Sequence, residues 1–124
     1  VGSRQRMIGN TVFHCTQECG GSTIVGFENH SGKTHLGSGI EPLAQVKVGF
    51  GNNGEDGTEG AHYQNVFGSY SHGPLLPKNP EFCDMLLRTA LGRRYGSVQL
   101  TPLDDTAELA AHNAMIQRLT TKHR

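Results

Sequence analysis

The sequence has 124 residues, which is enough for one small domain, and its 11 basic residues match its 11 acidic ones. A net charge of zero argues against a general nucleic-acid or anionic-membrane surface, and no apolar run approaches the roughly 18 residues that a membrane helix needs. Three cysteines fit a reducing cytoplasm, while 17 glycines and 35% hydrophobic residues predict a loop-rich chain or part of a larger domain.

The first half of the chain is expected to form strands. Runs of β-branched and aromatic residues predict them at residues 7–13, 23–30 and 44–50. A hairpin-like return is expected through 34–36. Residues 51–60 have almost no apolar content and predict a turn or mobile loop. Short strand pieces are then expected at 62–65 and 66–71.

The last third is expected to hold two helices. Asn79 is predicted to cap the first, with Pro80 as its first residue. Its apolar face is spaced as Phe82, Met85, Leu86, Thr89 and Ala90. The second begins near Asp105, where Asp105 and Glu108 have capping-box spacing. It is expected to pack through a stripe of small residues: Leu103, Ala107, Ala110, Ala111 and Ala114. Residues 97–100 predict a strand between the two.

The strand expected at 66–71 ends in His72, and Gly73 and Pro74 follow. Ligand sites in α/β folds lie outside the carboxyl ends of strands, so a His at that edge is well placed to act as a general base. Imidazole suits proton transfer because its unperturbed pKa is about 6.5. The alternative is a structural His that closes the end of a strand.

Two further motifs are expected to carry no chemistry. Residues 49–54 match G-x-G-x-x-G, but a dinucleotide site needs a helix to begin there, and acidic residues without helical periodicity follow. Cys15 and Cys19, with His14 and His30, lack the ligand spacing of a structural zinc site. Cys19 also lacks the strand–turn–helix setting of a nucleophile, because a strand follows it.

Three polar residues near the predicted strands are candidates for a site. Arg6 is either a solvated cation or a guanidinium that pairs with a substrate carboxylate. Glu28 and His30 lie two residues apart, so they share one face of their strand. They are either surface groups on an edge or a polar pair that lines the same site as His72.

Several of these stretches resemble one family. The resemblance is carried by Arg6–Asn10, Gly26–Thr34 (G-F-E-N-H-S-G-K-T), Gly49–Gly54 (G-F-G-N-N-G) and Gly68–Pro80 (G-S-Y-S-H-G-P-L-L-P-K-N-P). Together they resemble the class I glutamine amidotransferases of the cobyric acid synthase type, and most of all the glutaminase subunits of lipid II isoglutaminyl synthases. The resemblance covers about residues 4–116 and corresponds to the C-terminal part of the family domain only.

The resemblance implies an α/β fold in which residues 1–124 form the C-terminal portion of a single Rossmann-like amidotransferase domain. It implies a cysteine glutaminase that needs no metal or cofactor and passes ammonia from glutamine to a Mur-ligase-like synthetase subunit, for amidation of the lipid II D-glutamate in peptidoglycan synthesis. His72 matches the catalytic His, and Arg6 matches an arginine linked to the substrate or to active-site integrity. Glu28 and His30 match a motif near the pocket. Alternatives are amidation of a corrinoid precursor and a non-catalytic interaction module.

Two departures from the family pattern shape these expectations. The family nucleophile lies in a C-G-G-[YF]-Q elbow upstream of the position of Arg6, and these residues contain none. Since the sequence starts at Val1 rather than Met, we expect an excised piece. Without the nucleophile it is expected to be inactive alone, and the apolar surface left bare predicts self-association or a partly disordered edge. The His-x-Glu pattern of many class I enzymes is also missing, because Pro74 follows Gly73. The imidazole of His72 is then oriented by Glu28 or by a backbone carbonyl, or the enzyme works as a Cys-His dyad without an orienting group.

Overall fold

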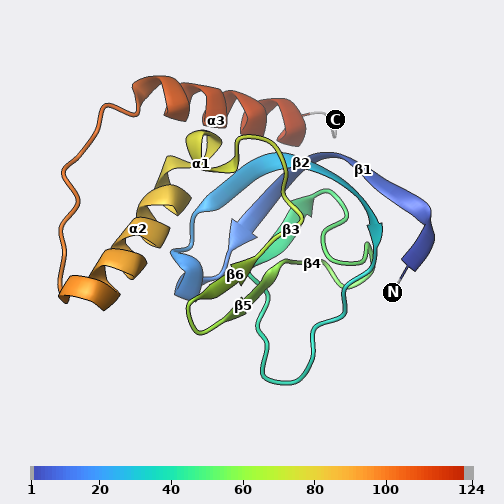
Figure 1. Cartoon of the computed structure of the whole chain (residues 1–124). Helices are drawn as coiled ribbons and strands as arrows, with labels where there is room; N and C mark the ends of the chain where they lie inside the picture. The colour runs from blue at the N-terminus through green and yellow to red at the C-terminus, as the bar shows by residue number, and fades with distance from the viewer. Residues whose placement is uncertain (1, 122–124) are drawn as a thin grey trace.

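The computed structural model describes residues 2–121, with side chains from Arg4 onward (Figure 1). A four-stranded sheet has the order β2-β1-β3-β4, and β5 and β6 form a separate hairpin. The strands are β1 (Gly2–Cys15), β2 (Thr23–Gly32), β3 (Ala44–Val48), β4 (Thr58–Glu59), β5 (Ala61–Tyr63) and β6 (Val66–Gly68). A 3₁₀ turn (Gln17–Cys19) joins β1 to β2. Every pair between the described strands is antiparallel.

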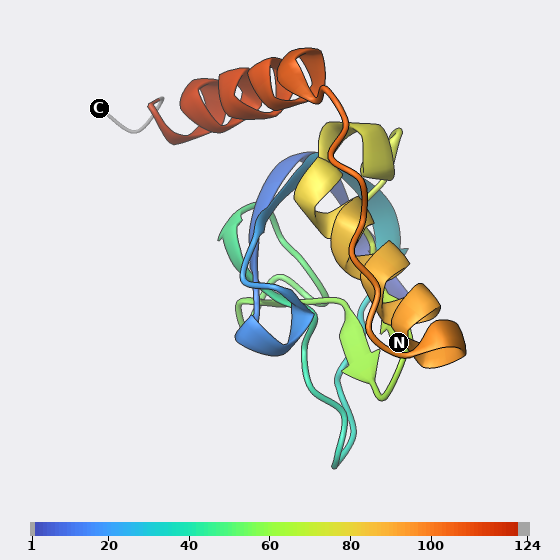
Figure 2. The same cartoon turned by 90° about the vertical axis from the view of Figure 1, so that its left-hand side faces the viewer.

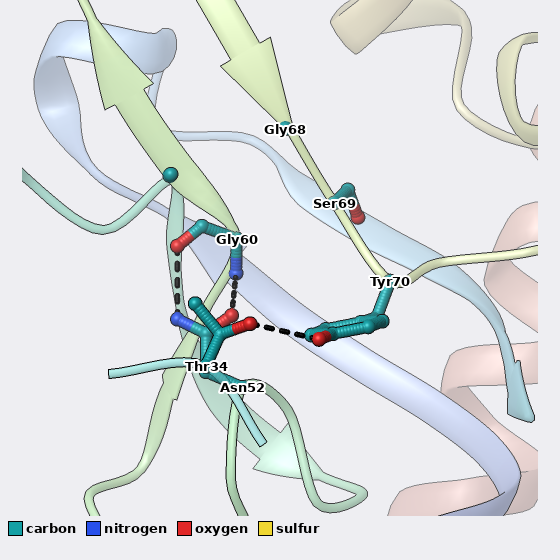
Figure 3. Close-up of a pocket in the computed structure, with 7 residues that line it drawn as sticks. Thr34, Asn52, Gly60, Gly68, Ser69 and Tyr70 are labelled. Carbon is teal, nitrogen blue, oxygen red and sulfur yellow. Dashed lines mark hydrogen bonds between the residues drawn. The ribbon is translucent and has the colours of Figure 1, made fainter. Parts of the chain in front are cut away.

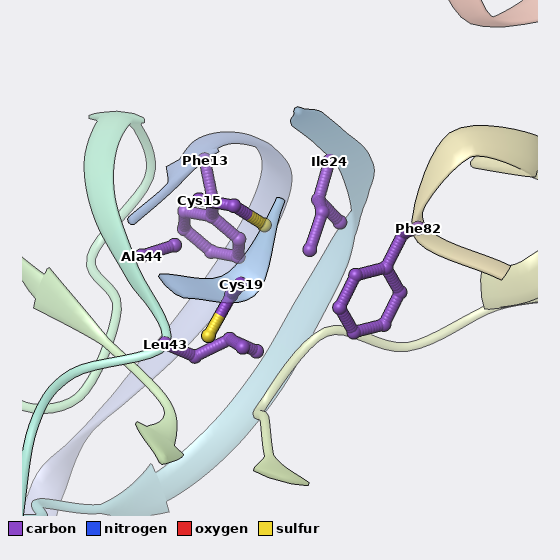
Figure 4. Close-up of a cluster of buried hydrophobic side chains, with 7 residues drawn as sticks. All are labelled: Phe13, Cys15, Cys19, Ile24, Leu43, Ala44 and Phe82. Carbon is purple, nitrogen blue, oxygen red and sulfur yellow. The ribbon is translucent and has the colours of Figure 1, made fainter. Parts of the chain in front are cut away.

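The sheet and one helix enclose the hydrophobic core (Figure 4). Alternate residues of β1 and β2 point inward because successive side chains of a strand lie on opposite faces. Phe13 and Ile24 are paired across these two strands and are both fully buried. Phe82 closes the cluster from α2 (Pro80–Tyr95). The seven buried members are Phe13, Cys15, Cys19, Ile24, Leu43, Ala44 and Phe82.

Two further helices complete the described chain. The short α1 (Leu75–Lys78) was not predicted, and it precedes α2 directly. An irregular connection then leads to α3 (Thr106–Thr120), which lies across α1 and the β1–β2 pair (Figure 2). A hydrogen bond of 2.7 Å between Nδ1 of His112 and the Lys78 carbonyl fixes α3 to α1. None of the helices among residues 2–121 has both the length and the apolar character needed to span a membrane.

Most predicted strands and both predicted helices are confirmed in position. β1, β2 and β3 contain or overlap the runs predicted at 7–13, 23–30 and 44–50. β5 overlaps the piece predicted at 62–65, and β6 forms the first part of the piece predicted at 66–71 but ends at Gly68, before His72. The hairpin-like return predicted at 34–36 and the strand predicted at 97–100 are wrong. Residues 34–36 and 97–100 are irregular, because no neighbouring segment provides a ladder of backbone partners for them.

The predicted helix starts are correct, but the side chains at them act differently. Asn79 makes no capping bond; its amide donates to the Val25 and Leu75 carbonyls and accepts from the Val25 N–H. Asp105 also makes no capping bond, and Asp104 accepts from the Thr106 N–H instead. The alanine stripe of α3 is exposed, so that prediction was wrong. The helix packs through its other face, on which His112, Met115, Ile116 and Leu119 are half-buried.

The mixture of helices and strands agrees with the predicted α/β class. The parallel strands of a Rossmann-like sheet do not occur among residues 2–121, where the sheet is antiparallel throughout.

Asn79→Ala is expected to lower the free energy of unfolding by about 2–4 kcal/mol, because it leaves buried polar groups of β2 and α1 without partners. Urea unfolding followed by circular dichroism measures the change. Asn113→Ala, on the exposed surface of α3, is the control and is expected to change stability by less than about 0.5 kcal/mol. Equal losses in the two variants would contradict the role assigned to Asn79.

Candidate active site

His72 is attached to the free edge of β2 by a single antiparallel bridge. Its N–H donates to the Phe27 carbonyl at 2.7 Å, and the Phe27 N–H donates to the His72 carbonyl at 3.4 Å. Gly26 makes this approach possible. A Cβ at Gly26 would collide with the Ser71 hydroxyl and would lie 3.1 Å from the His72 carbonyl oxygen. The imidazole is therefore placed by the backbone of β2.

One nitrogen of the His72 ring is occupied and the other is open. Nδ1 is hydrogen-bonded to the carbonyl oxygen of Tyr70, and the ring packs against Phe27 with centroids 5.6 Å apart. Because a carbonyl can only accept, Nδ1 must carry the proton, and the neutral ring then has its lone pair on Nε2. Nε2 makes no hydrogen bond within residues 2–121, and the side chain is exposed. This is the tautomer that a general base requires.

Arg6 lies on the same face of the sheet as His72. We call this the outer face and define it by Arg6, Ile8, Asn10, Phe27, Asn29 and His72, all of which are exposed. The Nε of Arg6 donates to Oδ1 of Asn29 at 2.8 Å. Asn29 follows by two residues the Phe27 on which His72 packs, a spacing of about 7 Å along the strand. The structure thus brings two of the four predicted site residues onto one open surface.

Glu28 and His30 point to the opposite face of β2. Glu28 is fully buried, and its carboxylate accepts the N–H groups of Phe50 at 2.6 Å and Gly51 at 3.0 Å. Nε2 of His30 lies 3.2 Å from the same carboxylate, and its ring stacks on Tyr70 with centroids 3.8 Å apart. These two residues hold the 49–54 loop and Tyr70, and the structure does not bring them to the outer face.

The group that orients His72 is a backbone carbonyl, one of the alternatives expected. Glu28 does not take this part, because its carboxylate bonds to His30, Phe50 and Gly51, and no hydrogen bond joins it to His72 in the described chain. The prediction that the pair lines the site with His72 is not supported by this arrangement. No short-range motif marks a carbonyl as an orienting group, so sequence reasoning had no means to select Tyr70.

The loop after β3 is a turn, one of the two alternatives predicted for residues 51–60. Asn52 and Asn53 are each 1% exposed, and the Asn52 amide exchanges two hydrogen bonds of 2.9 Å with the backbone of Gly60. Asn53 accepts from the N–H groups of Glu55 and Asp56. Gly51 has φ +71°, which an L side chain rarely adopts. Polar side chains therefore replace apolar packing in this loop.

A hollow of about 200 Å³ lies beside this loop (Figure 3). Its lining consists of Thr34, Asn52, Gly60, Ala61, Gly68, Ser69 and Tyr70, and the Tyr70 hydroxyl bonds to Oγ1 of Thr34 at 2.7 Å. None of the four predicted site residues lines it. The Tyr70 phenol is its one ionisable lining group, and its lining includes no imidazole, carboxylate or thiol.

The cysteines do not reach the candidate site. Cys15 and Cys19 are core side chains, and burial raises the pKa of Cys15 to about 11 and also raises the pKa of Cys19. Cys83 is half-buried in α2. Thiols held protonated are poor nucleophiles. No group of three or more His, Cys, Asp or Glu in the described range is arranged to hold a metal ion. The side chain of His14 is exposed, whereas those of Cys15 and Cys19 are buried.

The sequence was compared with known families and proteins. The profile of the CobB/CobQ-like glutamine amidotransferase domain matches residues 1–80, which is more than half of the chain. The chain therefore belongs to the CobB/CobQ-like family of glutamine amidotransferase domains, as its motifs predicted.

Three curated relatives give the comparison more detail. Subunit GatD of the lipid II isoglutaminyl synthase (glutamine-hydrolyzing) of Staphylococcus aureus is 47% identical over 96 residues, which are 77% of this chain and 39% of that protein. The same subunit of Streptococcus pneumoniae is 45% identical over 104 residues, 83% of this chain and 39% of that protein. A probable cobyric acid synthase of Methanothermobacter thermautotrophicus is 42% identical over 71 residues, 57% of this chain and 13% of that protein. The chain thus spans about two fifths of the two GatD subunits.

At pH 7.5, Cys83 is expected to react with iodoacetamide well before Cys15 and Cys19, because burial keeps these two thiols protonated and covered. Mass spectrometry of tryptic peptides after timed labelling of the native protein measures the order. Labelling in 6 M urea, roughly the concentration that unfolds a small domain, is the control and should make all three reactive. Rapid native labelling of Cys19 would contradict its place in the core.

Proposed function

We propose that this chain is the C-terminal portion of a glutaminase domain and supplies its general base, His72. The observation that carries the proposal is the orientation of the imidazole: Nδ1 is bound to the Tyr70 carbonyl, and Nε2 is open on an exposed face of the sheet. The nucleophile would be a cysteine outside these 124 residues, since Cys15 and Cys19 are buried with raised pKa values and Cys83 lies on α2 rather than on the outer face.

The proposed reaction proceeds in two stages. Nε2 of His72 takes the proton of the thiol as sulfur attacks the side-chain amide carbon of glutamine, and the same proton is given to the nitrogen that leaves as ammonia. The product is a glutamyl thioester. His72 then takes a proton from water, the oxygen attacks the thioester carbon, and the proton returns to the departing sulfur as glutamate forms. His72 gives up each proton that it takes, so its charge is the same at the start and the end of the cycle.

Arg6 is proposed to bind the α-carboxylate of glutamine. Its Nε is engaged with Asn29, which leaves the two Nη amino groups available as donors. A guanidinium anchored at one nitrogen is restricted in rotation and presents its remaining donors as a fork that matches a carboxylate. Glu28 and His30 are proposed to support the site from behind β2 by holding the 49–54 loop and Tyr70.

The rest of the domain is proposed to be Rossmann-like and to cover the outer face. Ile8 and Phe27 are 59% and 39% exposed there, beside the two residues assigned to catalysis and binding. Apolar side chains next to polar site residues indicate a surface that another part of the protein completes. The nucleophile elbow would approach Nε2 of His72 from this side.

The acceptor is proposed to be the D-glutamate of lipid II, amidated by a Mur-ligase-like synthetase subunit in the cytoplasm. The support is the similarity to two GatD subunits of lipid II isoglutaminyl synthases, which extends over 77% and 83% of this chain. Corrinoid amidation is the second candidate, favoured by the likeness to a probable cobyric acid synthase. That likeness covers 57% of the chain.

The 124-residue chain alone is expected to show no glutamine hydrolysis, because no cysteine belongs to the outer face that carries the base: Cys15 and Cys19 are buried in the core and Cys83 lies on α2. Glutamate release in a coupled dehydrogenase assay measures this. The same sample is expected to self-associate through the outer face in sedimentation velocity, and Ile8→Lys with Phe27→Lys should return it to monomer. Clear turnover by the isolated chain would overturn the proposed division of the site.

In the full-length protein, His72→Ala is expected to lower kcat for glutamine hydrolysis by about 10²–10⁴-fold, the usual contribution of a general base. His14→Ala is the matched control, since His14 is exposed on β1 and has no place in the proposed site. The assay measures ammonia and glutamate together. Retained kcat in His72→Ala, with an intact circular dichroism spectrum, would refute the role of His72.

A further inference from the structure

We propose that Glu59 is a positioning residue for His72. Its carboxylate holds the Ser69–Tyr70 backbone in the arrangement in which the Tyr70 carbonyl meets Nδ1 of His72. This inference rests on the proposed function, because it assigns Glu59 to the base of that reaction. Glu59 does not touch the outer face, and nothing in the sequence motifs marked it.

One oxygen atom of Glu59 organises three consecutive residues. Oε1 accepts the Ser69 hydroxyl at 2.7 Å and the Tyr70 N–H at 2.7 Å. The Ser69 oxygen in turn accepts the Ser71 N–H at 2.9 Å. His72 follows directly and is held to β2 by the Phe27 bridge. The segment that leads to the imidazole is therefore tied at each residue.

Tyr70 is the link between Glu59 and the base. Its N–H is bound to Glu59, its phenol to Thr34 at 2.7 Å, and its ring lies on His30. With both ends of the residue restrained, its carbonyl has a defined direction, and that carbonyl is the acceptor for Nδ1 of His72. If the Tyr70 backbone rotated, its carbonyl would turn away from Nδ1 of His72. The Nδ1–H tautomer would then lose the hydrogen bond that favours it over the Nε2–H tautomer.

The burial of Glu59 indicates that it does more than stabilise a turn. The side chain is fully buried, and its Oε2 has no hydrogen-bond partner in the described chain. Burial raises its pKa, while the bonds from Ser69 and Tyr70 act in the opposite direction; Glu28 and His30 also face it. A buried carboxyl group with one unpaired oxygen is unfavourable for folding, so stability alone does not explain its presence.

The position of Pro74 makes such a residue necessary. Two residues after His72 the chain has no carboxylate, and no acidic side chain bonds to the imidazole in the described residues. A peptide carbonyl can orient an imidazole only if the peptide itself is fixed. Glu59 supplies that restraint from β4, ten residues before Ser69 in the sequence.

The test reads the tautomer of His72 in the 124-residue chain. Multiple-bond ¹H–¹⁵N spectra of ¹⁵N-histidine protein, recorded with the ring neutral, separate Nδ1–H from Nε2–H forms. The wild type is expected to be mainly Nδ1–H. Glu59→Asp keeps the charge but is too short to reach both donors, and it is expected to lower the Nδ1–H to Nε2–H ratio about fivefold, the equivalent of one hydrogen bond. Glu59→Gln keeps an acceptor oxygen and is expected to preserve the ratio.

Phe82→Leu separates positioning from general loss of stability, because Phe82 belongs to the core cluster, which includes none of residues 69–72. It is expected to lower the melting temperature and leave the ratio unchanged. An unchanged ratio in folded Glu59→Asp, or an equal change in Phe82→Leu, would overturn the inference. If Glu59→Asp does not fold, Ser69→Ala removes one of the two donors to Oε1, and an unchanged ratio there would have the same meaning.

Kinetics of the full-length protein distinguish this inference from the proposed function. Glu59→Asp is expected to lower kcat with little change in KM, and Glu59→Gln to restore most of it. If His72→Ala retains activity, the proposed function fails whatever the tautomer does. If His72→Ala is inactive but Glu59→Asp keeps both the tautomer and kcat, only the role of Glu59 fails.

Discussion

The bridge between His72 and Phe27 is the contact on which the rest of the site depends. It attaches a segment without regular secondary structure to the free edge of β2, and Gly26 leaves the space that this approach needs. Asn79 then clamps the chain that follows to Val25 of the same strand. Because both attachments are to backbone atoms of β2, the position of the imidazole is set by the sheet itself.

The sequence predicted those parts of the fold that depend on local pattern. Alternation and β-branched residues located β1, β2 and β3, and the Asn79–Pro80 pair located the start of α2. It could not predict what depends on distant partners. Asn79 is a residue type that commonly caps helices, yet its amide binds a strand 54 residues away. Asn52 and Asn53 are polar but buried, because backbone groups both earlier and later in the chain accept their hydrogen bonds.

The candidate site, like the fold, was predictable where it depends on local motifs and not where it depends on distant partners. Family motifs singled out His72 and Arg6, and the structure places both on the outer face, where their roles remain proposals. Glu28 and His30 share a face as predicted, but the parity of β2 directs them inward while Phe27 and Asn29 face out. The alternation of side chains along a strand does not tell which face is covered, because that depends on the loop after β3 and on Tyr70.

The bonds from Phe50 and Gly51 to Glu28 explain why the G-x-G-x-x-G stretch misleads. In a phosphate-binding loop, such successive N–H groups point at an external anion. Here the N–H groups of Phe50 and Gly51 donate to the carboxylate of Glu28, which belongs to the protein itself. The N–H groups of this glycine-rich loop are therefore used to attach the loop to Glu28 of β2, and they are not available to an external anion.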